Sequence, residues 1–132
     1  MTSPPFAAPR RLAGPDAASA LFAELVAETV EVAAFAYLDA AQNLLGLRHV
    51  RSSAIDRLEV PIRAVASDAL AFDAFGVVMA HNHPSGDPTP SVADREVTRL
   101  LARALETLEV RLIDHLVMAP GGFVSFRRLG LL

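Results

Sequence analysis

The sequence predicts a mixed α/β fold in which helices cover one central sheet. The chain has 132 residues, 52% of them hydrophobic, which suits a single domain with a densely packed interior. Residues 77–80 form a short apolar run between two segments of helical periodicity, the pattern of a buried strand. Ser91 then precedes the clearest amphipathic helix of the chain. Alternation of strands and helices along a chain is typical of folds in which helices pack against a sheet.

The N-terminal segment predicts an arm followed by a helix. Residues 1–15 contain four prolines and little periodic apolar content, so we expect them to form a flexible arm. The single domain is then expected to span residues 16–132. Asp16 is suited to cap a first helix, whose apolar positions are Leu21, Phe22, Leu25 and Val26.

The middle of the chain predicts two strands and a helix before the buried run. The β-branched and aromatic content of residues 32–38 indicates a strand, and a turn at residues 40–43 leads into a second strand at residues 44–50. Pro61 suits the first turn of the next helix, because its missing N–H is not needed there. Gly76 is expected to separate that helix from the buried strand.

The last third predicts a helix and a hairpin. After a loop at residues 87–90, the helix that Ser91 opens has one apolar face, formed by Val97, Leu100, Leu101, Ala104, Leu105 and Leu108. Residues 110–118 are expected to form a strand, and a turn at residues 120–122 joins it to a closing strand at residues 123–126.

Composition and charge exclude several classes of protein. The absence of cysteine excludes disulfide scaffolds, thiol nucleophiles and cysteine-bound zinc. A net charge of −3 disfavours nucleic-acid binding through a basic surface, and Arg95, Arg99 and Arg103 are better explained as a solvated helix face than as a phosphate-binding stripe. The sequence contains neither an apolar stretch long enough to span a membrane nor a signal-peptide pattern. We therefore expect a soluble, cytoplasmic protein that does not bind membranes.

Two histidines at the end of the buried strand predict a metal site. His81 and His83 are two residues apart, so their side chains point the same way and can share one ion. Pro84 places them at the carboxyl edge of the strand, where α/β proteins commonly hold their sites. The alternative is a hydrogen-bonded pair of buried histidines.

Asp94 is the predicted third ligand of this ion. It lies eleven residues after His83, in the first turn of the following helix, and the loop between them can fold back. Two histidines and one aspartate leave a fourth tetrahedral position for water, as in catalytic zinc sites, although iron, manganese or cobalt would also fit. The competing interpretation of Ser91 and Asp94 is a capping box at the start of the helix.

The segment that contains these residues resembles the JAMM motif of MPN/JAB-domain metallopeptidases. It reads HNHPSGDPTPSVAD over residues 81–94, and its closest resemblance is to the RadC branch of that family. Residues 112–117 and 124–126 also resemble RadC proteins. The resemblance implies a three-layer α/β/α sandwich with a mixed central sheet, the cytidine-deaminase-like JAB/MPN fold. It also implies one zinc ion per chain and hydrolysis of a peptide or isopeptide bond in a peptide or protein substrate.

The resemblance further implies two catalytic residues. Glu31 aligns with the upstream glutamate of the family and would act as general base, with Glu28 as the local competitor. Ser91 would donate a hydrogen bond to the developing oxyanion or to the attacking water. Asn82 is expected to face away from the ligands and to brace a neighbouring loop. His115 is expected to be a buried, hydrogen-bonded histidine rather than a group that supports the ligands, and His49 has no assigned role.

Two other functions compete with hydrolysis. The first is a non-catalytic RadC-like module in DNA repair, DNA transactions or protein assembly. RadC proteins usually carry an N-terminal helix-hairpin-helix segment that residues 1–15 are too short to hold, so DNA contact through such a segment is not expected. The second is a zinc deaminase of the related fold, which the lack of cysteine disfavours. The sequence does not predict an oligomeric state.

Overall fold

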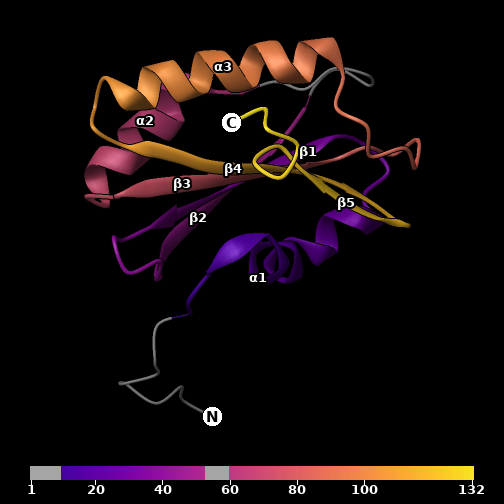
Figure 1. Ribbon diagram of the computed structural model, residues 1–132, viewed down its shortest axis with the longest axis horizontal. Helices are drawn as coiled ribbons and strands as arrows, with labels where there is room; N and C mark the ends of the chain where they lie inside the picture. Colours follow the sequence, from indigo (N-terminus) through magenta and orange to yellow (C-terminus); the bar gives the residue numbers. More distant parts are fainter. Residues whose placement is uncertain (1–9, 53–59) are drawn as a thin grey trace.

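The computed structural model describes residues 10–52 and 60–132 and shows one mixed sheet with helices on both faces (Figure 1). The strands are β1 (Val32–Leu38), β2 (Leu44–Arg51), β3 (Gly76–Asn82), β4 (Arg111–Ala119) and β5 (Gly122–Ser125), and their order across the sheet is β2-β1-β3-β4-β5. β3 and β4 are parallel, whereas the other neighbouring strands are antiparallel. The predicted mixed sheet is confirmed.

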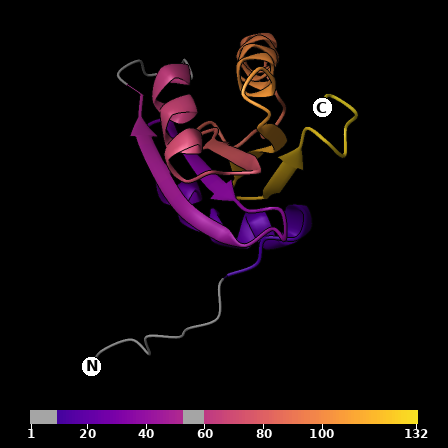
Figure 2. The same ribbon diagram turned by 90° about the vertical axis from the view of Figure 1, so that its left-hand side faces the viewer.

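The helices form the two outer layers. α2 (Ile62–Ala71) and α3 (Val92–Glu106) cover one face of the sheet, and α1 (Gly14–Leu21) with the short 3-10 helix η1 (Ala23–Ala27) covers the other (Figures 1 and 2). This is the predicted three-layer α/β/α sandwich. No helix in the described ranges has the length and apolar composition needed to cross a membrane.

Two hydrophobic clusters, one on each face, hold the layers together. Every residue of β1 and β3 is buried, because both strands are central and helices cover both of their faces. The cluster on the α1 side, called the α1-side cluster below, includes Phe22, Leu25, Leu38 and Leu116. The cluster on the α2 and α3 side includes Phe35, Tyr37, Met79, Leu101 and Leu105.

The start of the described chain differs from the expected arm. Residues 1–9 lie outside the described residues, but residues 10–12 are attached to the β1–β2 turn. Leu12 N–H donates to the Gln42 carbonyl, Leu44 N–H donates to the Arg10 carbonyl, and the Leu12 side chain is buried in the α1-side cluster. The prediction that the arm extends to residue 15 is wrong for this part, because long-range strand pairing leaves no local sequence signal.

The first helix begins earlier than expected and has no side-chain cap. α1 starts at Gly14, and Asp16 lies in its first turn while Ala13 occupies the cap position. Gly14 adopts a φ of 85°, a value that suits glycine, and Pro15 then begins the helix with its restricted φ. The predicted capping role of Asp16 is therefore wrong.

A register shift in β4 decides which side chains face α3. Val77 pairs with Leu112, but the next residue of β3, Val78, pairs with Asp114, so β4 contains one extra residue at Ile113. Met79 consequently pairs with His115. The extra residue reverses the alternation of β4 and directs His115 toward the α3 side of the sheet.

Candidate metal centre

The carboxyl end of β3 and the start of β1 bring Glu31 next to the two histidines. β1 is antiparallel to β3, and Ala33 pairs with His81. Extending this register by two residues places Glu31 opposite His83. Because side chains alternate along strands, Glu31, His81 and His83 share the face that α3 covers. One ligand atom from each of these three residues lies within 4.8 Å of the others, and such a group could hold a metal ion.

The N-terminal turn of α3 adds the carboxylate of Asp94. Its Oδ2 lies 3.0 Å from His83 Nε2, and its Oδ1 lies 3.4 Å from His81 Nε2. Ligand atoms placed 2.0–2.1 Å from one tetrahedral zinc ion are about 3.3 Å apart. Both distances of Asp94 are close to this spacing, so its carboxylate lies within reach of an ion held by the two imidazoles.

Hydrogen bonds at the other ring nitrogen direct each imidazole toward this point. His83 Nδ1 lies 2.7 Å from the Asp87 carbonyl, which can only accept, so Nδ1 carries a proton and Nε2, which contacts Asp94 Oδ2, is the nitrogen that an ion would bind. Gly86 makes the tight turn of this loop, with a φ of 92° and an N–H bonded to the His83 carbonyl. His81 Nδ1 lies 2.6 Å from His115 Nε2.

His81 Nε2 carries the observation that favours a metal ion most strongly. The side chain is fully buried, and among the described residues its Nε2 has no hydrogen-bond partner. A buried polar nitrogen that makes no hydrogen bond and has only the 3.4 Å contact with Asp94 Oδ1 is costly, so an ion that accepts its lone pair explains why the arrangement persists. The set of imidazole and carboxylate donors suits zinc and related divalent ions.

The charges at the centre favour an ionised aspartate. Burial alone would raise the pKa of Asp94, but the imidazoles of His81 and His83 and the Ser91 N–H outweigh burial and hold that pKa far below its usual range. The hydrogen bond to Asp94 raises the pKa of His83 above its ordinary value. A proton and a metal ion therefore compete for the same nitrogen of His83.

Ser91 and Asp94 do form the capping box that the sequence allowed as an alternative. Ser91 Oγ accepts from the Asp94 N–H at 3.0 Å, and Asp94 Oδ2 accepts from the Ser91 N–H at 2.8 Å. The box holds the Asp94 side chain in one position, with Oδ1 toward His81. The capping and metal interpretations are compatible, since the Ser91 hydroxyl keeps a hydrogen to donate.

The structure places the other predicted residues as follows. The carboxylate of Glu28, the competitor for Glu31, pairs with Arg51 on β2. Asn82 braces the segment before β1, as predicted: its Oδ1 accepts from the Val32 N–H, and its Nδ2 donates to the carbonyls of Glu28 and Val30. His49 is exposed on the edge strand β2, outside the centre.

His115 is the residue that sequence reasoning undervalued. It is a buried, hydrogen-bonded histidine as expected, but one of its partners is His81 itself. Its other ring nitrogen lies 2.7 Å from Thr98 Oγ1, and burial lowers its pKa well below the ordinary value. Its contact with His81 depends on the extra residue in β4, and the alternation of apolar and polar residues in the sequence does not reveal that residue.

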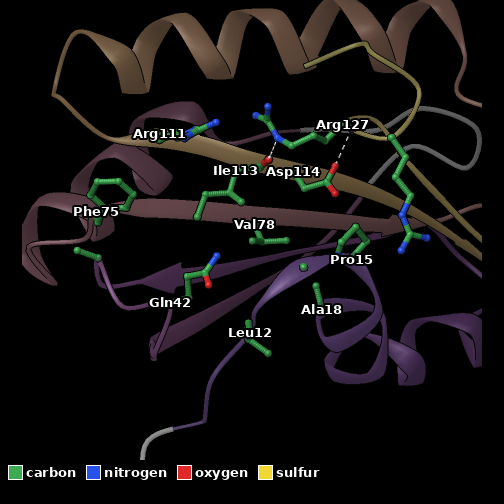
Figure 3. Close-up of a pocket in the computed structure, with 13 residues that line it drawn as sticks. Leu12, Pro15, Ala18, Gln42, Phe75, Val78, Arg111, Ile113, Asp114 and Arg127 are labelled. Carbon is green, nitrogen blue, oxygen red and sulfur yellow. Dashed lines mark hydrogen bonds between the residues drawn. The ribbon is translucent and has the colours of Figure 1, made fainter.

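A cavity of about 440 Å³ lies apart from this centre, on the α1 face of the sheet (Figure 3). Its floor includes Val78 and Ile113, and within the described residues three of its four charged lining side chains, all but that of Arg111, form a hydrogen bond or an ion pair. Arg127 donates to the Ile113 carbonyl, as Figure 3 shows, Arg128 pairs with Asp16, and Asp114 accepts from Ser125. The cavity therefore offers no cluster of free catalytic groups.

Comparisons with known proteins find a matching family model and several relatives. A family model described as a RadC-like JAB domain matches residues 12–131. A UPF0758 protein of Pseudomonas fluorescens (strain SBW25) is 38% identical over 103 residues, which cover 78% of this chain and 46% of that protein. A UPF0758 protein of Symbiobacterium thermophilum is 42% identical over 95 residues, covering 72% and 41%. One of Xanthomonas campestris pv. campestris (strain 8004) is 38% identical over 120 residues, covering 90% and 53%. The chain thus spans about half the length of these relatives.

Proposed function

The chain belongs to the RadC-like JAB domain family, and we propose that it is a zinc-dependent hydrolase of peptide or isopeptide bonds. The proposal combines this membership with the two contacts of Asp94, 3.4 Å to His81 Nε2 and 3.0 Å to His83 Nε2, which suit ligands of one tetrahedral ion. Its strongest support is the buried Nε2 of His81, which has no hydrogen-bond partner within the described residues.

In this proposal the three ligands are His81, His83 and Asp94, and Glu31 stays outside the set. Bound there, a zinc ion would lower the pKa of a water molecule and would polarise the carbonyl of the substrate. The carboxylate of Asp94 offsets part of the charge of the ion. Glu31 lies close enough to both imidazoles to reach a water held between them and the substrate.

Glu31 and Ser91 then divide the proton transfer and the charge stabilisation. Glu31 accepts a proton from the attacking water and returns it to the leaving amine, so the carboxylate is regenerated at the end of the cycle. Ser91 keeps its cap contact with the Asp94 N–H and donates its own hydrogen to the substrate oxygen as negative charge develops there.

The test separates ligand from base with two isosteric variants. We expect Asp94→Asn to weaken zinc binding by at least tenfold, since the amide lacks the ligand charge. Glu31→Gln should bind zinc with an affinity close to that of the wild type but cleave peptides at least 100-fold more slowly, because general-base catalysis is lost. Calorimetric zinc titration and a peptide-library cleavage screen, each repeated with a chelator, provide the two measurements.

Three outcomes would contradict the proposal. Cleavage by Glu31→Gln at the wild-type rate would exclude Glu31 as the base. Loss of zinc binding in Glu31→Gln together with full binding in Asp94→Asn would show that Glu31 is a ligand and that Asp94 is not. Stoichiometric zinc without any chelator-sensitive cleavage would favour the non-catalytic module.

A further inference from the structure

We infer that His115 and Thr98 are positioning residues that hold His81 in the tautomer and orientation needed to bind a metal through Nε2. The inference rests on the proposed function for the identity of the ligands, but its geometry stands on its own. His81, His115 and Thr98 come from β3, β4 and α3, and all three are buried.

The three side chains form one continuous chain of short hydrogen bonds. His81 Nδ1 lies 2.6 Å from His115 Nε2, and His115 Nδ1 lies 2.7 Å from Thr98 Oγ1. Thr98 Oγ1 lies 2.6 Å from the backbone carbonyl of Asp94, one helical turn earlier. The chain therefore begins at one proposed ligand and ends at the backbone of another.

The direction of every bond in this chain follows from its last member. A carbonyl oxygen can only accept, so the single hydroxyl hydrogen of Thr98 points to Asp94. Thr98 Oγ1 must then accept from His115 Nδ1–H, which leaves a lone pair on His115 Nε2. His115 Nε2 in turn accepts from His81 Nδ1–H. The proton of His81 is thereby assigned to Nδ1, and its Nε2 lone pair faces Asp94.

Two further contacts fix the His115 ring in the plane that this chain requires. Its ring stacks on Phe126, with centroids 4.4 Å apart and an interplanar angle of 22°. The Phe126 N–H donates to the His115 carbonyl at 3.0 Å, so the same residue holds both ring and backbone. An imidazole locked in this way gives His81 one available rotamer and one available tautomer, which lowers the cost of binding an ion.

The shared helix turn couples the two proposed ligands. Thr98 and Asp94 are four residues apart on α3, so the helix that brings the carboxylate to His81 also brings the hydroxyl to His115. A displacement of α3 would therefore disturb the carboxylate and the orientation of His81 together.

The direct test is an NMR measurement of ring tautomers in the metal-free protein. Long-range ¹H–¹⁵N correlation spectra of the imidazole rings should show His81 and His115 both protonated at Nδ1. A proton on Nε2 of either ring would overturn the inference. This readout needs neither metal nor activity, so it remains informative if the proposed function fails.

Variants test whether this chain of hydrogen bonds supports metal binding. His115→Phe keeps an aromatic ring against Phe126 but removes the acceptor for His81, and we expect zinc affinity to fall by about 10- to 100-fold. Thr98→Val should release the tautomer of His115 and weaken zinc binding by a smaller factor. The matched control is Thr98→Ser, which keeps the hydroxyl and should restore the wild-type spectrum and affinity.

The outcomes distinguish this inference from the proposed function. If the wild type binds zinc and cleaves peptide while His115→Phe and Thr98→Val bind as tightly as Thr98→Ser, the positioning role is wrong and the function stands. If the wild type binds no metal but the tautomers are as assigned, the proposed function fails and the hydrogen-bond chain stands. Should His115→Phe fail to fold, Thr98→Val and the wild-type spectrum still decide the question.

Discussion

Asn82 shows how one side chain between the two histidines supports the centre without facing it. Its amide satisfies three backbone groups in residues 28–32, namely the N–H of Val32, which begins β1, and the carbonyls of Glu28 and Val30. Since Glu31 lies within this segment, Asn82 links the position of the proposed base to the strand that carries both histidines.

We predict that Asn82→Ala destabilises the protein and impairs catalysis more than metal binding. The substitution leaves buried backbone groups without partners, which should lower the free energy of unfolding by about 3 kcal/mol. Urea unfolding measures this cost, and zinc titration should show an affinity within a few-fold of the wild type. Asn82→Asp is the matched variant: it keeps the acceptor for the Val32 N–H but turns a buried carboxylate oxygen toward the carbonyls of Glu28 and Val30, so it should be destabilised as well. Equal stability of Asn82→Ala and wild type would show that these bonds contribute nothing.

At the scale of the elements, Asp114 holds the irregular part of β4 in place. Its Oδ1 accepts from the N–H groups of His115 and Arg127, and its Oδ2 accepts from Ser125 Oγ at 2.6 Å. These bonds tie Asp114, which follows the extra residue of β4, to the end of β5 and the residues after it. They therefore help to present His115 on the face that α3 covers.

Asp114→Ala should consequently disturb the centre from the opposite face of the sheet. We expect a loss of about 2–4 kcal/mol in the free energy of unfolding, because a buried hydroxyl and backbone N–H groups lose their acceptor. Zinc affinity should also fall. The isosteric Asp114→Asn, which retains one acceptor oxygen, should lose less of both. If Asp114→Ala keeps the zinc affinity of the wild type, the link between this part of β4 and His81 is excluded.

A separate polar cluster ties α2 to β1 and β2. Asp68 on α2 accepts from the Arg48 guanidinium, with Nη2–Oδ1 at 2.8 Å, and from Tyr37 Oη at 2.8 Å. The hydrogen bond from Arg48 holds the pKa of Asp68 below its ordinary value of 3.8. Because the folded-state pKa is depressed, the stabilisation is complete above about pH 4 and is lost as the pH falls through the folded-state value.

We therefore expect Asp68→Asn to be less stable than the wild type at pH 7 and nearly as stable at low pH. Urea unfolding at several pH values between 7 and 2 measures the difference, which should shrink steadily below pH 4. The control is Glu96→Gln, an exposed position on α3 that has no ion pair within the described ranges. A difference independent of pH would show that the charge of Asp68 does not contribute.

Sequence patterns predicted the elements whose signals are local. The strand at residues 32–38 and the helix that Ser91 caps follow from composition and periodicity, and the structure has both. The convergence of His81, His83 and Asp94 also follows from the sequence, because strand alternation and a short connection bring them together.

The features that the sequence did not predict depend on contacts between distant segments. The attachment of Leu12 depends on its pairing with Gln42, thirty residues later. The role of His115 depends on a register shift against β3, and strict alternation from Leu112 would direct it to the wrong face. Neither segment has a local composition that distinguishes these arrangements from the expected ones.

At the scale of the whole molecule, the centre joins three parts of the fold. Glu31 precedes β1, the two histidines lie at and just beyond the end of β3, and Asp94 lies in the first turn of α3. An ion bound to them would therefore link the sheet to one of its covering helices. Since these parts separate on unfolding, we expect zinc to bind the native state in preference to the unfolded chain.

Zinc should therefore raise the stability of the whole domain. At a free zinc concentration 100 times Kd, the expected gain in the free energy of unfolding is about 2.7 kcal/mol. Thermal unfolding with and without zinc measures it as a rise in Tm. The rise should disappear in His83→Ala and remain in His49→Ala, which removes an exposed histidine of β2. An identical rise in both variants would show binding elsewhere.

The most direct test of the central claim is anomalous diffraction at the zinc edge from crystals grown with zinc. We predict one peak per chain, 2.0–2.1 Å from His81 Nε2, His83 Nε2 and an oxygen of Asp94, with Glu31 separated from it by one water. The absence of a peak between these side chains, or a peak bound by Glu31 while Asp94 lies out of reach, would contradict the account.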